Sequence, residues 1–265
     1  MPSHPWLLYV YPWMPYPRRV IIYLREKDIP SSLVTVVPVS DPQRGSKAPP
    51  EYPPKPPGSL PILAIPNEGG FIYIRQSLAI INYLDELCDA GASGFPLSTY
   101  PMRGANSLAR ARHNELLALA DECTIAWNPV RMFGSGAGTM SLPAASKEMA
   151  RWVYRSLATI ESWWQEEDRD MARLRQGGGG DVTVAEIVLY QFLEFVGDCY
   201  GRDMTREGEV GKDVYGREGT GGFSKIGEFL EAFGTRESAR RDSEAGEIAS
   251  EEVLSKMRTW AEGSL

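Results

Sequence analysis

The hydrophobic positions of the chain change their period about a third of the way along it. Before residue 90, β-branched or aromatic apolar runs alternate with stretches of helical spacing. The apolar runs predict strands over residues 6–11, 32–39, 60–65 and 71–74. Helical spacing predicts helices over residues 17–27 and 76–89. Elements in this order form a small α/β domain.

After residue 90, only helical spacing remains. Residues 91–104 form a linker rich in Gly, Ser and Pro, and Thr183 with Glu186 has the spacing of a capping box at a helix start. The predicted helices cover residues 105–127, 146–174, 183–200, 225–233 and 250–260. The sequence therefore predicts two domains, an α/β domain over residues 1–90 and an all-helical domain over residues 105–265.

The composition is that of a globular protein whose partners are small molecules or other proteins. Of the 265 residues, 43% are hydrophobic and 24% are charged, which excludes a disordered or collagen-like chain. The 28 basic and 35 acidic side chains give a net charge of −7, and the basic ones are scattered. Binding to nucleic acid or to an anionic membrane by bulk charge is therefore disfavoured. The arginines of residues 236–241 lie among acidic neighbours and predict a solvent-exposed face.

Cysteine and histidine usage predicts a reduced protein without a metal site. Cys88, Cys123 and Cys199 are far apart and lie in helical patterns, which favours packed, reduced thiols. Two histidines without any CxxC or HExxH spacing do not build a metal site. No stretch approaches the ~18 apolar residues of a spanning helix, and residues 6–10 lack the basic start of a signal peptide. The chain is therefore expected in the cytoplasm and not in a membrane.

In the first domain, residues 58–63 (GSLPIL) and 76–84 (QSLAIINYL) form two motifs that resemble segments of the cytosolic glutathione S-transferase superfamily. Residues 58–63, Gly-Ser-Leu-Pro-Ile-Leu, are similar to the family's Gly-x-hydrophobic-Pro-x-Leu segment, in which the peptide bond before proline is cis. Residues 76–84, Gln-Ser-Leu-Ala-Ile-Ile-Asn-Tyr-Leu, resemble the family's [EQ]-S-x-A-I-x-x-Y-L helix start. The resemblance spans residues 7–238. It implies a thioredoxin-like α/β N-terminal domain and an all-α C-terminal helical bundle.

The resemblance also implies that glutathione is the co-substrate. The backbone of Leu60, which precedes Pro61, would pair with the tripeptide. Gln76 and Ser77 would lie at a helix N-terminus and receive the γ-glutamyl carboxylate, because the unpaired amides there carry partial positive charge. The loop at Leu60 and the helix start at Gln76 are therefore expected to hold the two ends of glutathione between them.

Further positions match the family pattern outside these motifs. Lys47, fourteen positions before Pro61, lies where some members place a lysine facing the glycine carboxylate of glutathione. Ser59 lies where members often carry glutamine. In the helical domain, residues 183–186 resemble the family's Thr-x-Ala-Asp cap, and residues 229–238 resemble the closing helix of fungal-type members. The resemblance to fungal-type members makes a step in secondary metabolism plausible by analogy.

The group that activates the thiol does not follow from the family pattern. Glutathione reacts as its thiolate, and a free thiol with a pKa near 8.5 is mostly protonated at neutral pH. Members with the pattern [SC]-x-x-x-x-R-[VT] place Ser or Cys six positions before the residue after the arginine. Here Val20 follows Arg19, and that position holds Met14, which has no proton to donate. The alternatives are Tyr11 at the strand end, placed first, then Tyr16 in the first helical turn, or backbone amides with the helix dipole.

A hydrophobic small molecule is the expected second substrate. Trp13 and Met14 in the first domain, and Trp127 and Arg131 in the helical domain, are expected to bind it, because apolar walls with few polar groups suit such a molecule. The thiolate either stays bonded to this molecule, as in a transferase, or leaves after a bond rotation, as in a cis-trans isomerase. A non-catalytic, glutathione-binding or regulatory protein is the third interpretation. The family also implies a homodimer.

Overall fold

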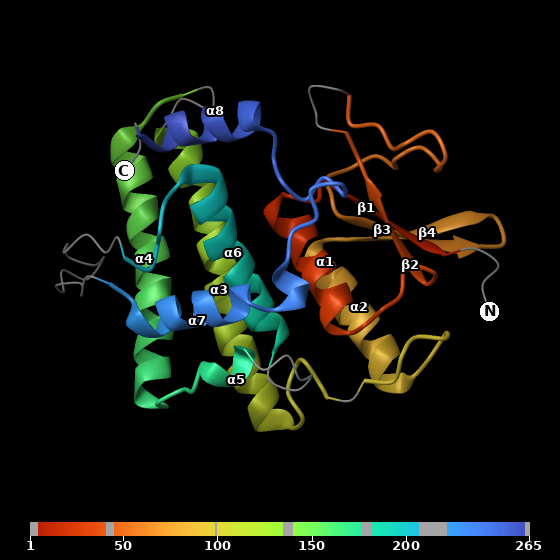
Figure 1. Cartoon of the computed structure of the whole chain (residues 1–265), viewed down its shortest axis with the longest axis horizontal. Coiled ribbons are helices and arrows are strands. Elements are labelled where there is room, and N and C mark those ends of the chain that lie inside the picture. Colours follow the sequence, from red (N-terminus) through yellow and green to blue (C-terminus); the bar gives the residue numbers. More distant parts are fainter. Residues whose placement is uncertain are drawn as a thin grey trace. The chain divides into compact units, whose positions relative to one another are not determined.

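The chain divides into two compact units in its computed structural model (Figure 1). The structure describes residues 5–40, 45–98, 100–134, 140–175, 182–206 and 222–262. One unit comprises Met1–Ala105 together with Glu237–Ile248, and the other comprises Asn106–Arg236 together with Ala249–Leu265. Residues 237–248 therefore belong with the α/β part of the chain, although the sequence analysis assigns them to the helical domain.

The first unit is a mixed four-stranded sheet with two α-helices, which confirms the expected thioredoxin-like fold. Its elements are β1 (Trp6–Val10), α1 (Pro15–Glu26), β2 (Val34–Pro38), β3 (Ile62–Asn67), β4 (Gly70–Arg75) and α2 (Ser77–Ala90). The strand order is β2-β1-β3-β4. β1 is parallel to β2 and antiparallel to β3, and β3 is antiparallel to β4. Each predicted element is present, with its ends within two residues of the prediction.

Proline residues mark the start of α1, and a glycine marks the end of α2. Pro15 is the first residue of α1 and Pro17 the third, positions at which a missing N–H and a fixed φ are tolerated. α2 ends at Gly91, whose φ of 56° is the left-handed C-cap that glycine adopts without strain. Figure 1 shows α1 and α2 side by side on one face of the sheet. Val20 of α1 and Leu84 of α2 are fully buried there.

The second unit is helical throughout its described residues, as predicted. Its helices are α3 (Ser107–Gly134), α4 (Pro143–Glu166), α5 (Ala172–Arg175), α6 (Val184–Tyr200), α7 (Ser224–Gly234) and α8 (Glu251–Glu262). α6 is apolar on nearly all sides, with Ile187, Leu189 and Phe192 fully buried. A helix of that composition forms the centre of a bundle.

One predicted helix is interrupted. The pattern over residues 146–174 predicts a single helix, but α4 ends at Glu166 and α5 begins at Ala172. Between them Asp168 has a φ of 42°, and the Arg169 N–H donates to the carbonyl of Trp164 at 3.0 Å. The turn allows the Arg169 guanidinium to bind the buried carboxylate of Glu186, a contact between residues 17 apart that the local pattern does not encode.

Buried carboxylates cap two helices of the second unit. Thr183 and Glu186 form the predicted capping box at the start of α6. Burial raises the pKa of Glu186, and the Arg169 charge and the bonds to Thr183 oppose that rise. Glu161 of α4 accepts the N–H groups of Lys225 and Ile226, at 3.0 and 2.9 Å, and so caps the first turn of α7. The first cap is local in sequence, whereas the second joins distant helices.

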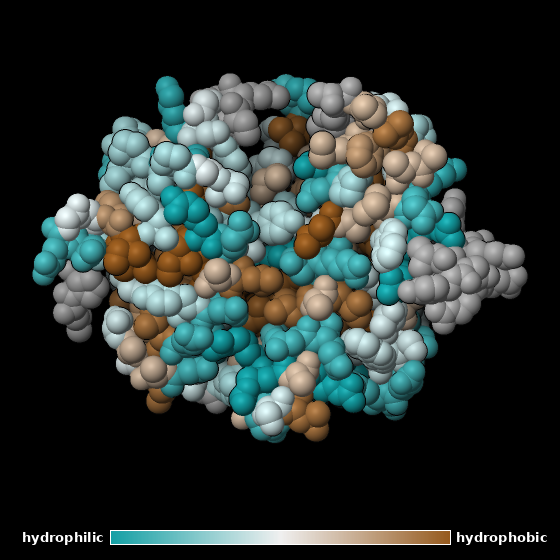
Figure 2. Space-filling view, turned by 180° about the vertical axis from the view of Figure 1, so that it is seen from behind, coloured by the Kyte–Doolittle hydropathy of each residue, from teal (hydrophilic) through white to brown (hydrophobic). Residues whose placement is uncertain are grey.

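Apolar side chains on the surface lie in separate groups among hydrophilic ones (Figure 2). On α3, Leu108 and Ile125 are 70% and 56% exposed. Within the described part of the chain, no helix combines the length and the apolarity that crossing a membrane requires.

Residues 237–248 form a strap that binds α1 through buried charges. Arg18 of α1 is 1% exposed and donates to Glu247 Oε2 at 2.8 Å and to the Ala239 carbonyl at 2.5 Å. Arg25, two turns further along the same face of α1, also binds Glu247 and donates to the Arg240 carbonyl at 2.6 Å. Glu247 is 3% exposed and is held by both guanidinium groups.

The strap corrects the expectation of a solvated face over residues 236–241. Arg236 is buried and donates to the Leu174 carbonyl at 2.6 Å, and Arg241 donates to the Glu247 carbonyl at 2.8 Å. Arg240 alone of the three arginines is exposed. A run of alternating charges predicts solvent exposure only when no distant partner exists. Here Arg236 binds a carbonyl 62 residues away in sequence, and the Arg240 carbonyl accepts from Arg25, 215 residues away.

Removing the Glu247 carboxylate should destabilise the protein strongly. Glu247→Ala leaves a buried Arg18 guanidinium without its counter-charge, and we expect a loss of about 3–5 kcal/mol in the free energy of unfolding. Urea denaturation followed by circular dichroism measures it. Glu244→Ala, at an exposed position of the same strap, is the control and should change stability by less than about 0.5 kcal/mol. Equal stabilities of the two variants would contradict a clamping role for Glu247.

Candidate functional site

The strand register brings the expected site segments to one end of the sheet. Parallel β1 and β2 end together at Val10 and Pro38. The first residue of β3, Ile62, pairs with Tyr9 of β1 on one side and with Arg75 of β4 on the other. The ends of β1, β2 and β4 and the start of β3 therefore lie together. We call this the site end of the sheet.

The expected binding segments at Leu60 and at Gln76 both adjoin the paired residues Ile62 and Arg75 at the site end. Pro61 immediately precedes Ile62, and Gln76 immediately follows Arg75. The Leu60–Pro61 peptide bond is cis, as the sequence predicts. Gln76 is exposed, has a φ of 73° and is the N-cap of α2, while Ser77 is buried as its first residue. The free amides of the first α2 turn therefore lie at the site end, beside Leu60.

Lys47 reaches the site end through the segment that follows β2. Its backbone N–H donates to Ser40 Oγ, and its carbonyl accepts the N–H of Ser40, both at 2.9 Å. Val39 in turn donates to the Val10 carbonyl at 2.8 Å. An open pocket of about 440 Å³ is lined by Pro38, Val39, Ser40, Lys47, Ala48 and Pro49. The Lys47 side chain is exposed, so its ammonium group is available to an anion.

Ser59 lies in a loop that a second lysine closes. Lys55 donates from Nζ to the carbonyls of Pro56 and Gly58, both at 2.8 Å. Gly58 has a φ of 120°, a conformation that side-chain-bearing residues rarely adopt. Ser59 follows it and is exposed, one residue before Leu60. Sequence reasoning missed Lys55, because its partners are backbone carbonyls that no residue pattern reveals.

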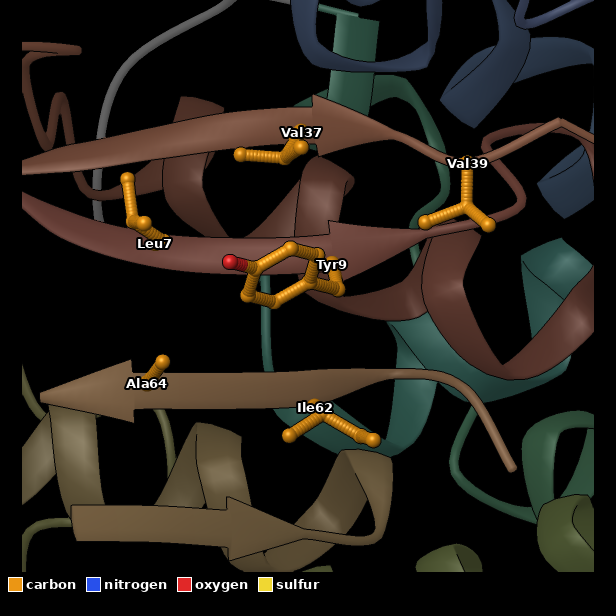
Figure 3. Packing of buried hydrophobic residues seen from close by; sticks show 6 residues of the cluster. All are labelled: Leu7, Tyr9, Val37, Val39, Ile62 and Ala64. Carbon is orange, nitrogen blue, oxygen red and sulfur yellow. The ribbon is translucent and has the colours of Figure 1, made fainter. Parts of the chain in front are cut away.

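The proline-rich loop over residues 47–60 covers the sheet face opposite the helices. Side chains at alternate positions point to that face (Figure 3), as the period of a strand requires. They form a cluster of Leu7, Tyr9, Val37, Val39, Ile62 and Ala64. Ala48, Tyr52 and Leu60 pack against it, and the Tyr9 hydroxyl donates to the Pro53 carbonyl at 2.9 Å. The loop thus stabilises the sheet and carries Lys47 and Leu60 to the site end.

Tyr11, the first candidate for activating the thiol, lies at the site end just after β1. It is half-buried against the cluster of Figure 3, and its hydroxyl is 2.5 Å from Ser46 Oγ. Ser46 has a φ of 52° and directly precedes Lys47. If Ser46 donates in this pair, the Tyr11 proton is free to point to a ligand.

Met14 and Tyr16 lie at the start of α1. Met14 is the N-cap without a side-chain bond, and its own N–H donates to the Tyr11 carbonyl at 3.0 Å. Pro15 and Pro17 have no N–H, so Tyr16 supplies the one free amide of the first three helical residues. The Arg19 guanidinium lies over the Tyr16 ring, 4.9 Å from its centre. Stabilisation of a thiolate by several backbone amides is therefore limited at this helix.

The expected co-substrate residues divide between the two units. Trp13 is half-buried in the turn between Tyr11 and Met14 of the first unit. Trp127 and Arg131 lie on α3 of the second unit. Trp127 is 2% exposed and packs its ring edge-on against Tyr200, with the ring centres 5.3 Å apart.

A buried carboxylate that sequence reasoning missed joins the helices behind the site end. Asp85 of α2 accepts from the Tyr23 hydroxyl and from Lys27 Nζ, both at 3.0 Å, and from Arg103 Nε at 2.7 Å. Burial raises the pKa of Tyr23, and the Asp85 charge adds to the rise. Burial also raises the pKa of the nearby Cys88 thiol. All three cysteines are buried and outside any disulfide, as predicted.

Neither residues nor geometry point to a metal in this site. Among the described residues, no group of three or more His, Cys, Asp or Glu side chains is arranged to hold an ion.

Residues 13–87 match the family model of the glutathione S-transferase N-terminal domain. A search of the curated proteins finds no matching sequence. The chain is similar to the solved structure of a glutathione S-transferase from Methylobacillus flagellatus with glutathione bound, at 20% identity, covering 88% of this chain and 96% of that one, with a TM-score of 0.60. Yeast Gtt2, from Saccharomyces cerevisiae, is similar at 19% identity over 88% and 98%, with a TM-score of 0.54. Ure2p in complex with glutathione is similar at 14% identity over 90% and 98%, with a TM-score of 0.60.

These likenesses establish the fold. The chain has the architecture of the glutathione transferases, a thioredoxin-like unit and a helical unit. At 14–20% identity they carry no information on substrate.

Removing either hydroxyl of the Tyr11–Ser46 pair should lower the free energy of unfolding by a similar amount. Tyr11→Phe and Ser46→Ala each remove one hydrogen bond, so each should lower the free energy of unfolding by about 0.5–1.5 kcal/mol. The double variant should lose no more than the larger single loss, because both changes remove one interaction. Urea denaturation of the four proteins measures the cycle, with Tyr73→Phe at an exposed position as the control. Additive losses would show that the two hydroxyls do not interact.

Proposed function

We propose that the chain is a glutathione-dependent enzyme whose first unit holds glutathione at the site end of the sheet. The observation that carries the proposal is the meeting there of the free amides of α2, the backbone of Leu60 and the exposed ammonium of Lys47. Glutathione is a peptide with a carboxylate at each end and a thiol between them. Two anion sites on either side of an exposed backbone segment match that distribution of charge. The glutathione-bound structures of similar fold support the assignment.

In this proposal each binding residue has a separate role. The γ-glutamyl carboxylate lies at the N-terminus of α2, where the amides near Gln76 and Ser77 and the helix dipole stabilise a negative charge. The Leu60 backbone pairs with the peptide in the middle. Lys47 binds the glycine carboxylate, and the Ser59 hydroxyl donates to the same end of the peptide.

Tyr11 is our first choice for stabilising the thiolate, and Tyr16 is the second. A phenol donates a hydrogen bond to sulfur and lowers the thiol pKa by favouring the charged form. The contact with Ser46 fixes the Tyr11 hydroxyl at the site end, and this favours Tyr11. Tyr16 would add its backbone N–H. Met14 would contribute an apolar contact beside Trp13.

The proposed reaction begins with attack of the glutathione thiolate on an electrophilic or conjugated carbon of a hydrophobic molecule. A new carbon–sulfur bond forms. In a transferase, either the bond to a leaving group breaks and that group departs with the electron pair, or the double bond opens and the resulting carbanion takes up a proton. In an isomerase the same bond breaks again after rotation about the former double bond, and glutathione is released unchanged. Mass spectrometry separates the two reactions, because only the transferase product gains the mass of the glutathionyl group.

Met14 favours a second candidate function, a non-catalytic protein that binds glutathione. The position holds neither of the side chains that the family pattern places there, and methionine is only a weak acceptor. Binding of glutathione without any lowering of its thiol pKa would identify this alternative.

Three wider features complete the proposal. The buried, reduced cysteines suit the cytoplasm, where thiols stay unoxidised. A homodimer, which the family resemblance implies, is also part of the proposal. A dedicated step in secondary metabolism would account for a hydrophobic co-substrate, by analogy with fungal-type members.

Loss of one charge at the site end should weaken glutathione binding. Lys47→Ala removes a charge-assisted hydrogen bond of about 1.5–3 kcal/mol, so the Kd should rise about tenfold or more. Isothermal titration calorimetry measures this, and Gln76→Ala should also weaken binding. Lys147→Ala, an exposed lysine on α4, is the matched control and should leave the Kd unchanged. Absence of heat with the wild-type protein would end the proposal.

The effect of the phenol on the thiolate should appear as a shift in the thiol pKa of bound glutathione. With Tyr11→Phe, the pKa of the bound thiol should rise toward its free value of about 8.5. Ultraviolet absorbance of the thiolate as a function of pH measures the shift. Tyr16→Phe is the comparison, and it should leave the curve nearer to that of the wild type. The reverse ranking would transfer the role to Tyr16, and two unchanged curves would remove both.

A further inference from the structure

A second cavity lies on the same sheet face as the Lys47 pocket, toward the other end of the strands. Its volume is about 820 Å³, which is large enough for a small organic molecule. Leu7 is part of its lining and lies at the opposite end of the cluster of Figure 3 from Val39, which lines the Lys47 pocket. Asn67, the last residue of β3, also lines the cavity, whereas Ile62 at the site end is the first. We call this cavity the far pocket.

Aromatic rings and prolines form the walls of the far pocket. Tyr52 of the proline-rich loop and Phe71 of β4 line it, and both side chains also pack against the cluster of Figure 3. Three prolines from different segments complete these walls, namely Pro5, Pro53 and Pro66. Walls of this kind suit the apolar body of a small molecule.

The walls are held in place by contacts within the first unit. The Pro53 carbonyl accepts from the Tyr9 hydroxyl at 2.9 Å, which fixes the loop against the sheet. The Phe71 ring stacks on that of Tyr73, with the ring centres 6.3 Å apart. A pocket whose walls are already ordered loses little affinity to their ordering when a ligand binds.

The charged side chains that line the far pocket are both acidic. Glu51 precedes Tyr52 in the loop, and Glu68 lies in the turn between β3 and β4. Both are exposed, and neither forms an ion pair with another described residue. The described lining residues include no Lys, Arg or His, and Lys55 of the same loop donates to the carbonyls of Pro56 and Gly58 instead. The pocket therefore favours a cation and disfavours an anion.

We propose that the far pocket binds an organic ammonium ion with an aromatic or bulky apolar body. The carboxylates of Glu51 and Glu68 stabilise the ammonium charge, and the rings of Tyr52 and Phe71 contact the apolar body. An aromatic ring also attracts a cation that lies over its face. The inference is independent of the proposed function, because the anionic ends of glutathione belong to Lys47 and α2 at the site end. One sheet face thus offers a basic pocket at one end and an acidic pocket at the other.

The test compares two probes of nearly the same size that differ in charge at pH 7.5, 2-naphthylmethylamine and 2-naphthylmethanol, each added to the full chain. Calorimetry should give the wild-type protein about a fivefold preference for the amine, a modest value because both carboxylates are exposed. Glu51→Gln and Glu68→Gln should each lower that preference about twofold, and the double variant should remove it. The Kd of the alcohol should stay the same throughout. Glu244→Gln, at an exposed position of the strap on α1, is the matched control and should keep the wild-type preference.

Two further measurements show where the amine binds. Lys47→Ala and saturating glutathione should each leave the Kd of the amine unchanged, and raised ionic strength should shrink its preference over the alcohol. The melting temperatures of the glutamine variants should equal that of the wild type, because both positions are exposed.

Four results would overturn the proposal: no binding of the amine, equal affinities for the two probes in the wild type, an undiminished preference in the double variant, or displacement of the amine by glutathione. Titration of the wild-type protein with glutathione alone tests the proposed function separately. Amine binding that depends on Glu51 and Glu68, without any glutathione binding, would sustain the far pocket and refute the proposed function.

Discussion

The antiparallel pairing of β3 with its two neighbours is the constraint on which the site depends. Ile62 faces Tyr9 on one side and Arg75 on the other, and this single register sets where Leu60, Pro61 and the start of α2 lie. A slip of one residue would turn every side chain of β3 to the opposite face. Ile62 and Ala64 would leave the cluster of Figure 3, so burial of that cluster fixes the register and, with it, the site.

Buried carboxylates join parts of the chain that hydrophobic packing alone would leave less precisely placed. Asp85, Glu161, Glu186 and Glu247 are each almost fully buried, and each has cationic or N–H partners. Burial of a carboxylate is costly unless its oxygens are satisfied, so each partner set is specific in position. In both units, these contacts link helices to segments far away in sequence.

The local features of the fold follow from the sequence, and the long-range ones do not. Strand and helix positions and the Thr183–Glu186 cap are encoded within a few neighbouring residues. The cis bond before Pro61 was expected through a family resemblance. The roles of Glu247 and Lys55 depend on partners that no periodicity reveals. Only the family resemblance led us to expect Lys47 and Gln76 at the same end of the sheet. Their separation in sequence says nothing about whether they lie close together in the fold. Tyr200 is the last residue of α6, and the apolar pattern of that helix predicts only that its side chains are buried in the bundle.

The strap has a consequence for the order in which the protein is completed during synthesis. Arg18 leaves the ribosome before the helical unit is synthesised, yet its counter-ion Glu247 emerges 229 residues later. Until then α1 carries a guanidinium group that its unit is built to enclose, and the nascent domain remains open to solvent along that helix. The α/β unit, although most of it is made before the helical unit, therefore reaches its final form only after residue 247 has been synthesised.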